Sequence, residues 1–112
     1  MAKFEKTVVG DFDTIVTELD QAILGGGVSM NLVDENTYES GDMKVLVRVY
    51  DKYFMRNSSR ASLSLTVVDD GRTVYVSAIG AGGGQGAIFN FSWGAEDELV
   101  NIVSERLNQL RL

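Results

Sequence analysis

The chain has 112 residues, 45% of them hydrophobic, which suffices for one domain with one modest core. It contains no Cys and no His, so disulfides, thiolate metal sites, the commonest metal ligand and the usual neutral-pH general base are excluded. A formal net charge of -6 argues against indiscriminate binding to nucleic acid or to anionic membranes. We therefore expect a protein that is not an enzyme and has no metal or cofactor.

The organisation of the chain indicates a single domain over residues 1–112. No internal repeat or linker divides it, and Pro is absent. Residues 1–6 are charged and lack the apolar core of a signal peptide, and no apolar run reaches the length of a membrane span. Together with the absence of Cys, this leads us to expect a cytoplasmic protein without a membrane segment.

The first elements predicted along the chain are a strand and a helix. Residues 3–9 read as a strand with Phe4 and Val8 on one face, and Asp11 is a suitable N-cap after a glycine. Apolar residues then recur at three- and four-residue spacing, as in an amphipathic helix: Phe12, Ile15, Val16, Leu19 and Ile23. We expect Gly25–Gly27 to end this helix, because glycine tolerates the left-handed cap conformation.

Two further strands are predicted before the middle of the chain. Val28, Met30 and Leu32 alternate with polar residues, and the acidic segment 34–42 is expected to interrupt that strand as a solvated loop. This segment fails the spacing of a calcium-binding EF-hand loop. From residue 43, valines alternate with a second series that includes Lys44, Leu46, Arg48 and Tyr50. The basic residues at a spacing of four also suit a helix, but the density of Val and Tyr favours a long strand.

The next predicted feature is a hairpin whose type I′ turn is centred on Asp70-Gly71. This centring sets Leu65 opposite Val76 and Val67 opposite Val74, with Thr66 opposite Tyr75 on the other face. One register therefore sorts apolar from polar residues on both strands, and a slip of one residue would destroy that sorting.

The last part of the chain contains the glycine run 80–86, a short predicted strand over 87–91 and a final helix that opens at Ser92 or Gly94. Its first turn carries three acidic residues, and its predicted buried stripe is Leu99, Ile102, Val103, Leu107 and Leu110. The order β-α-β-β-β-β-(β)-α predicts an α+β fold: a mostly antiparallel sheet of five or six strands with two helices on one face.

The glycine run is the first candidate site. The pattern Gly82-x-Gly84-x-x-Ala87 fits the permissive form of a dinucleotide-binding fingerprint, but the residues after it are β-like, whereas the fingerprint opens a helix. A crossing or hairpin loop is the favoured interpretation. The alternative is a loop that holds a small, possibly anionic ligand with Gly82, Gly83, Gly84, Gln85 and Arg48.

The sheet face away from the helices is the second candidate. We expect it to carry Lys44, Leu46, Arg48, Tyr50, Lys52, Ser64, Thr66 and Tyr75. Because the apolar part of this set is large for a solvated face, we predict a homodimer interface at Leu46, Tyr50 and Tyr75. A solvated face is the alternative, and nucleic-acid binding is disfavoured by the net charge.

Several motifs resemble those of a family of small bacterial proteins known only as a domain of unknown function. These are Gly10-Asp11-Phe12, Ser77-Ala78-Ile79-Gly80 with the glycine run, Phe89-Asn90-Phe91 and Trp93-Gly94-Ala95-Glu96. The resemblance covers nearly the whole chain and implies a bacterial cytoplasmic protein of similar size, with no catalytic residue to transfer. Two hypotheses result: a non-enzymatic interaction module that forms a homodimer, and a small-molecule binder whose pocket is gated by Gly80–Gly86.

Overall fold

The computed structural model describes residues 2–26, 29–54, 59–82 and 95–112. Their elements, in chain order, are β1 (Ala2–Val8), α1 (Phe12–Leu24), β2 (Met30–Ser40), β3 (Met43–Phe54), β4 (Ser59–Asp69), β5 (Val74–Gly82) and α2 (Ala95–Leu110). The predicted α+β fold is confirmed. The additional short strand predicted over 87–91 lies outside the described residues.

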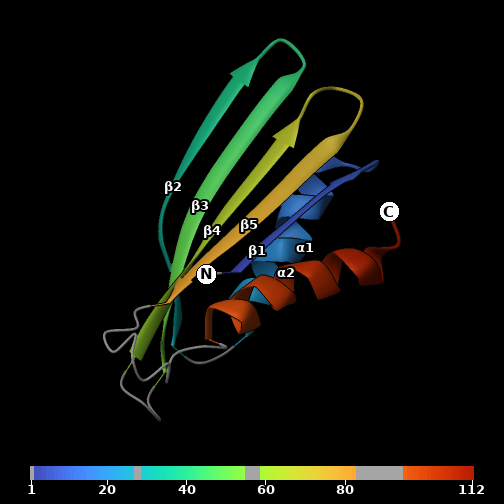
Figure 1. Cartoon of the computed structure of the whole chain (residues 1–112). Helices are drawn as coiled ribbons and strands as arrows, with labels where there is room; N and C mark the ends of the chain where they lie inside the picture. Colours follow the sequence, from blue (N-terminus) through green and yellow to red (C-terminus); the bar gives the residue numbers. More distant parts are fainter. Residues whose placement is uncertain (1, 27–28, 55–58, 83–94) are drawn as a thin grey trace.

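The five strands form one antiparallel sheet in the order β1-β5-β4-β3-β2. Both helices lie on the same side of this sheet, with α2 across β1, β5 and β4 (Figure 1). The hairpin of β2 and β3 reaches beyond the helices, which gives a chain with extents of 46 × 26 × 24 Å. The sheet therefore has one covered face, toward the helices, and one open face.

The helix α1 begins as predicted and ends for a different reason. The Asp11 carboxylate accepts hydrogen bonds from the Thr14 backbone N–H at 3.0 Å and the Thr14 hydroxyl at 2.8 Å, which makes it the N-cap. At the other end Gly25 has φ -82°, so the left-handed cap that we expected there is wrong. At the next position, a Cβ on Gly26 would lie 2.8 Å from Cδ1 of Ile102 on α2, so a larger residue there would require the Ile102 side chain to move.

The strand β2 corrects the prediction of an acidic loop. It continues through residues 34–40 and pairs with β3 up to Ser40 and Met43, before a turn in which Gly41 has φ 58°. Every residue from Asn31 to Ser40 is exposed, because β2 is an edge strand beyond the helices. Pairing with β3 satisfies the backbone while the acidic side chains remain in water, so polar composition does not prevent a strand here.

The predicted β4–β5 hairpin is present, but each residue of β4 faces a partner two residues further along β5 than predicted. Leu65 faces Ala78 and Val67 faces Val76, because the turn is centred on Gly71 and Arg72. The Asp70 backbone N–H donates to the Thr73 carbonyl at 3.2 Å. Gly71 has φ 92° and Arg72 does not have a positive φ, so the turn is not type I′. A shift of two preserves which face each side chain occupies, so the predicted sorting survives.

The core lies between the covered face and the two helices. Fully buried sheet residues meet the stripe of α2 formed by Leu99, Val103 and Leu107 and the stripe of α1 formed by Ile15, Leu19 and Ile23. The sheet residues are Leu63, Leu65, Val67, Val74, Val76 and Ala78. Most of the predicted helix stripes are thus confirmed as core.

The first glycine of the predicted run has a packing role. Gly80 belongs to β5, and a Cβ there would lie 2.6 Å from the carbonyl oxygen of Glu96 and 3.1 Å from Val100. The first turn of α2 therefore rests directly on the backbone of β5. Glycine is present at this position because the two backbones approach closely.

Candidate functional site

The two faces of β3 are the reverse of the prediction. Leu46 lies opposite Val67 and Tyr50 lies opposite Leu63, so both point into the core. Leu46 is 3% exposed and Tyr50 is 0% exposed, which makes their predicted place in an exposed dimer interface wrong. The physical reason is that the larger Leu and Tyr side chains fill the space under the helices, and the valines between them occupy the open face.

The basic residues of β3 accompany Leu46 and Tyr50 to the covered side, so the predicted cationic open face is also wrong. The Lys52 ammonium donates to the Gly26 carbonyl at 3.1 Å and lies 3.5 Å from Glu98. The Lys44 ammonium stands 5.8 Å from the centre of the Phe12 ring. These contacts connect the sheet to the ends of the helices.

The open face is formed by the residues of the sheet that point away from the helices. Its apolar members include Tyr38, Met43, Val45, Val47, Val49, Tyr53, Val68, Tyr75 and Ile79, and its hydroxyl-bearing members include Ser62, Ser64, Thr66 and Ser77. Tyr38 is 61% exposed and Ile79 is 39% exposed. Tyr75 lies on this face as predicted, and its hydroxyl donates to Glu5 at 3.2 Å.

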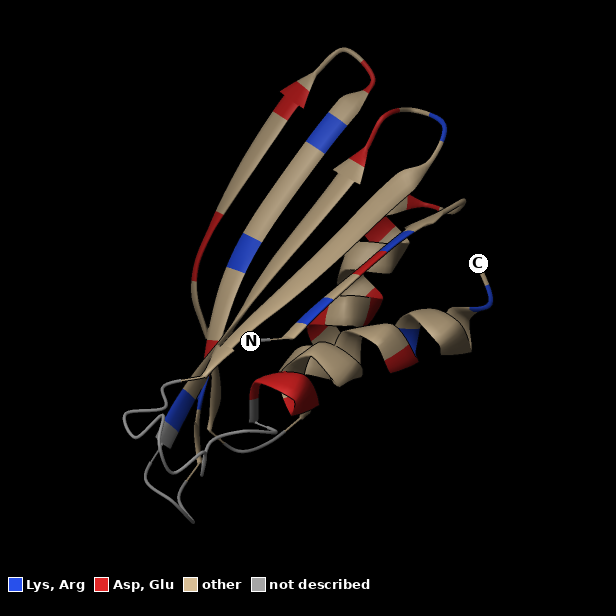
Figure 2. Ribbon diagram, in the orientation of Figure 1, with Lys and Arg blue, Asp and Glu red and all other residues tan. Residues whose placement is uncertain are grey.

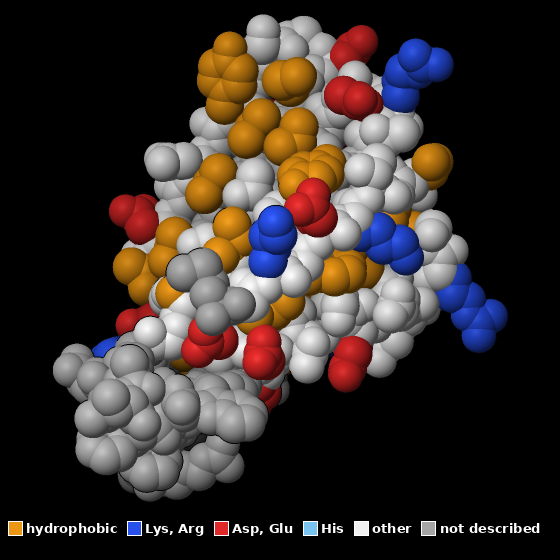
Figure 3. All heavy atoms as spheres, viewed as in Figure 1, with side chains coloured by type: hydrophobic (Ala, Val, Ile, Leu, Met, Phe, Trp, Pro, Cys, Tyr) orange, Lys and Arg blue, Asp and Glu red, His pale blue; other side chains and the backbone are white. Residues whose placement is uncertain are grey.

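The open face carries little net charge. β5 has no charged residue, and those of β4 lie near its ends (Figure 2). Lys3 lies 3.6 Å from Glu5, and Arg60 lies 3.1 Å from Asp51, so most of the charges that the described strands place on this face are paired with each other. Figure 3 shows hydrophobic side chains gathered along the sheet on this side. The result is a nearly neutral apolar surface on an acidic protein.

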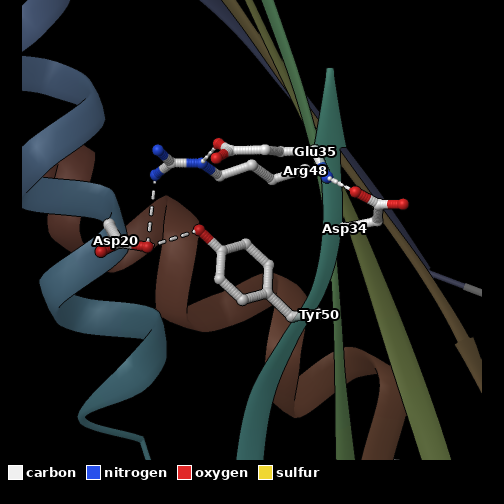
Figure 4. Close-up of polar contacts among 5 residues, drawn as sticks. All are labelled: Asp20, Asp34, Glu35, Arg48 and Tyr50. Carbon is white, nitrogen blue, oxygen red and sulfur yellow. Dashed lines mark hydrogen bonds and ion pairs between the residues drawn. The ribbon is translucent and has the colours of Figure 1, made fainter. Parts of the chain in front are cut away.

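The covered side contains a polar cluster of Asp20, Glu35, Arg48 and Tyr50, which we call the Arg48 cluster (Figure 4). The Tyr50 hydroxyl donates to Asp20 on α1 at 2.8 Å. The Arg48 guanidinium lies 3.3 Å from Asp20 and 2.7 Å from Glu35 on β2. The cluster therefore joins α1 to two neighbouring strands.

A β-bulge determines which acidic residue reaches Arg48. Leu32 lies opposite Tyr50 and Asp34 lies opposite Val49, so Val33 is an extra residue in β2. This insertion sets Glu35 opposite Arg48 and sends Asp34 to the other face, as Figure 4 shows. The carboxylate of Asp34 instead accepts the backbone N–H of Glu35 at 2.8 Å.

The surroundings hold the Arg48 cluster in one protonation state. Burial and the hydrogen bond to Asp20 raise the pKa of the Tyr50 phenol, so it remains a neutral donor. Burial lowers the pKa of Arg48, but the hydrogen bond to Glu35 and the proximity of Tyr50 outweigh it and raise the pKa above its ordinary value. Because two carboxylates already face the single guanidinium, the cluster is suited to positioning α1 rather than to binding an anion.

The predicted ligand set is only partly described. Arg48 lies opposite Leu65 and Gly82 lies opposite Ala61, so they are separated by at least about 13 Å along β4. Gly83, Gly84 and Gln85 lie outside the described residues. Gly82 instead borders a hollow of about 280 Å³ with Asp51, Arg60, Ala61, Ser62 and Ala81. The structure thus pairs Gly82 with Arg60 rather than with Arg48.

Sequence reasoning missed Asp20 and Glu35. Asp20 directly follows Leu19 of the buried stripe and lies four residues after Val16, so it sits at the margin of the face that α1 buries. That spacing is a signal for an acidic side chain directed at a partner on the sheet. Glu35 carried no such signal, because its facing depends on the bulge at Val33.

The described residues contain no group of three or more acidic side chains placed to hold a metal ion. Within the same ranges, no helix is long and apolar enough to cross a membrane. The predicted solvated character of the acidic segment 34–42 agrees with its exposure, although it forms a strand and a turn.

The fold and its surfaces define a small α+β protein with one helix-covered and one uncovered sheet face. The chain belongs to a family of unknown function (DUF6054), whose sequence model matches residues 1–111. The resemblance to a small domain of unknown function is thereby confirmed. Comparison with curated proteins and with solved structures gave no match.

Proposed function

We propose that this protein is a non-enzymatic interaction module that forms a homodimer by packing the open faces of two copies together. The observation that carries the proposal is the nearly neutral, apolar open face, in which Val45, Val47, Val49 and Val68 form a continuous group beside Tyr75. Antiparallel sheets with one solvated face ordinarily alternate apolar and polar residues strictly. In β3 the open-facing series is as apolar as the covered one.

The size of the open face supports a specific interface. Five strands about 4.8 Å apart, and on average about 33 Å long, give it an area of about 800 Å². A standard interface buries about 800 Å² on each partner, so the face is of the right order once side-chain relief is included. Two sheets packed this way make a sandwich about 10 Å apart, with valines interdigitating across it.

Charge favours the open face over other surfaces as the place where a second copy binds. Each chain carries a net charge of -6, so two copies repel each other at most orientations. The open face is where this repulsion is smallest, because Lys3 pairs with Glu5 and Arg60 pairs with Asp51 within it. A twofold axis through the face would pair the same patch with itself, as in most homodimers.

The dimer is tested with Val68→Lys, which places an ammonium on the open face of β4, the central strand of the sheet. Light scattering coupled to size exclusion at micromolar concentration should give twice the 12.2-kDa chain mass for the unchanged protein and one chain mass for the variant. Val9→Lys is the matched control, because Val9 is 70% exposed and lies outside the sheet. A wild-type mass of one chain, or a folded Val68→Lys dimer, would contradict the proposal.

The hollow beside Gly82 favours a second candidate function, the binding of a small anionic ligand. Arg60 supplies a guanidinium and Ser62 a hydroxyl at its wall, and Gly82 of the glycine run borders it. Arg60 is paired with Asp51 at 3.1 Å, so an anionic ligand would replace Asp51 as its partner. In a thermal-shift screen of anionic metabolites, a metabolite that binds should raise the melting temperature of the protein, and Arg60→Ala should remove that rise. Absence of a shift across the screen would count against this function.

We also propose a cellular location for the protein, the bacterial cytoplasm. A chain without Cys suits a reducing compartment, and the resemblance to small bacterial proteins suits a bacterial cytoplasm. Fractionation of cells that express a tagged copy would test the location.

A further inference from the structure

The two edges of the sheet differ in length and charge. β2 pairs with β3 alone among the described strands, so about half of its backbone N–H and C=O groups point outward. It has 11 residues, whereas β1 at the other edge has 7. β2 carries Asp34, Glu35 and Glu39 without a basic residue, and β1 carries two lysines with one glutamate.

The outer edge of β2 lacks most of the features that block strand pairing. After the bulge at Val33, residues 34–40 pair with β3 without another irregularity. There is no proline in the chain, and the whole of 31–40 is exposed. Val33 is 58% exposed and Tyr38 is 61% exposed, so apolar side chains accompany the free backbone groups. Such an edge is a template for another strand.

Charge selects what pairs with this edge. Two β2 strands side by side would bring acidic residues close together, and like charges opposite each other destabilise a strand pair. Glu39 and Glu35, the latter already paired with Arg48 at 2.7 Å, point to the covered side of the sheet, and Asp34 and Tyr38 point to the open side. A complementary strand therefore has Lys or Arg at positions four apart on one face and apolar residues on the other.

We propose that the outer edge of β2 binds an extended, lysine- or arginine-bearing segment of a partner protein by strand addition. Main-chain hydrogen bonds to residues 34–40 would supply affinity, and the acidic side chains would select a basic segment. The outward backbone groups of β2 lie at the edge of the sheet rather than on its open face, so they are available in the monomer and in the proposed dimer. The occupant extends the sheet by one strand beside β2.

The probe is a fluorescein-labelled peptide that alternates Lys and Val, with anisotropy measured at low salt. We expect saturable binding by the unchanged protein and no binding of a matched peptide with Glu in place of Lys. A peptide of the same charge with prolines in place of alternate valines should also fail, because proline cannot donate to the ladder. Equal binding of the proline peptide would overturn the proposal, since it would show attraction without strand pairing.

Protein variants locate the site. Glu39→Lys should weaken binding of the Lys peptide by about three- to tenfold, because one charge attraction becomes a repulsion. Glu105→Lys makes the same charge change at an exposed position on α2 and should have little effect. An equal loss in both variants would overturn the assignment to β2. The Val68→Lys variant should still bind the peptide, and loss of binding there would assign it to the open face instead.

Discussion

The two faces of the sheet differ in the size and burial of the residues that they carry. On the covered face, large side chains such as Leu65 and Tyr50 are 0% exposed, and the Tyr50 hydroxyl donates to Asp20 on α1. On the open face, valines, serines and threonines of β3, β4 and β5 are half-buried and meet no helix. The basic residues of β3 lie on the inner face, and its valines lie on the outer one.

This difference teaches that side-chain volume and partners, rather than polarity, decided the facing of β3. Arg48 and Lys52 extend over the covered face, with their charged groups at carboxylates on neighbouring elements. The side chains of Val45, Val47 and Val49 are too small to fill the layer under the helices. An apolar series is therefore left outside, and it is this surplus that supports the proposed dimer.

The largest difference between the two faces is expected when the same valine-to-alanine truncation is made on each. Val76→Ala on the covered face should lower the free energy of unfolding by about 2–3 kcal/mol, because it removes fully buried methyl groups and leaves a cavity. Val47→Ala on the open face should cost less than about 1 kcal/mol in the monomer. Urea denaturation of both variants in the Val68→Lys background measures the two values. Equal losses would mean that the open face is packed as tightly as the covered one.

A second variant tests how closely α2 approaches the covered face. Gly80→Ala should destabilise the fold by about 1–3 kcal/mol, because the new Cβ would meet the Glu96 carbonyl at 2.6 Å and α2 must shift. Ser77→Ala on the open side of the same strand is the control and should be nearly neutral. The melting temperatures of the two variants make the comparison. A neutral Gly80→Ala would show that α2 does not rest on β5.

The smallest effect expected is that of Tyr50→Phe, which removes the hydroxyl that donates to Asp20. The loss should be about 1 kcal/mol near neutral pH, whereas Tyr75→Phe on the open face should change little. Urea denaturation at neutral pH measures both.

The Tyr50 phenol also predicts a pH dependence. Because its pKa is raised in the folded state, that state holds the proton more tightly than the unfolded chain does. Its contribution is complete below the ordinary tyrosine pKa of about 10 and is lost as the pH rises above it. Tyr50→Phe should therefore reduce the decline in unfolding free energy as the pH rises above about 10. An unchanged decline would contradict the assigned environment of Tyr50.

Local patterns in the sequence determined the elements and much of the core. The spacing of Ile15, Leu19 and Ile23, the cap at Asp11 and the alternation in β4 and β5 each depend on nearby residues, so they predicted the helices, the hairpin and the α+β class correctly. Each residue of β4 and β5 lies on its predicted face although the turn is centred one residue away from the predicted position. The reason is that the register changed by two residues, an even number.

The tertiary structure alone decided the facing of β3, the length of β2 and the residues around Arg48. Both series of β3 are partly apolar, so only pairing with Leu63 and Val67 shows which one is inside. β2 persists as a strand because β3 is there to pair with it, and the bulge at Val33 selects Glu35 as the partner of Arg48. These features depend on contacts between segments far apart in the chain, and the local pattern of residues carries no record of which segments will meet.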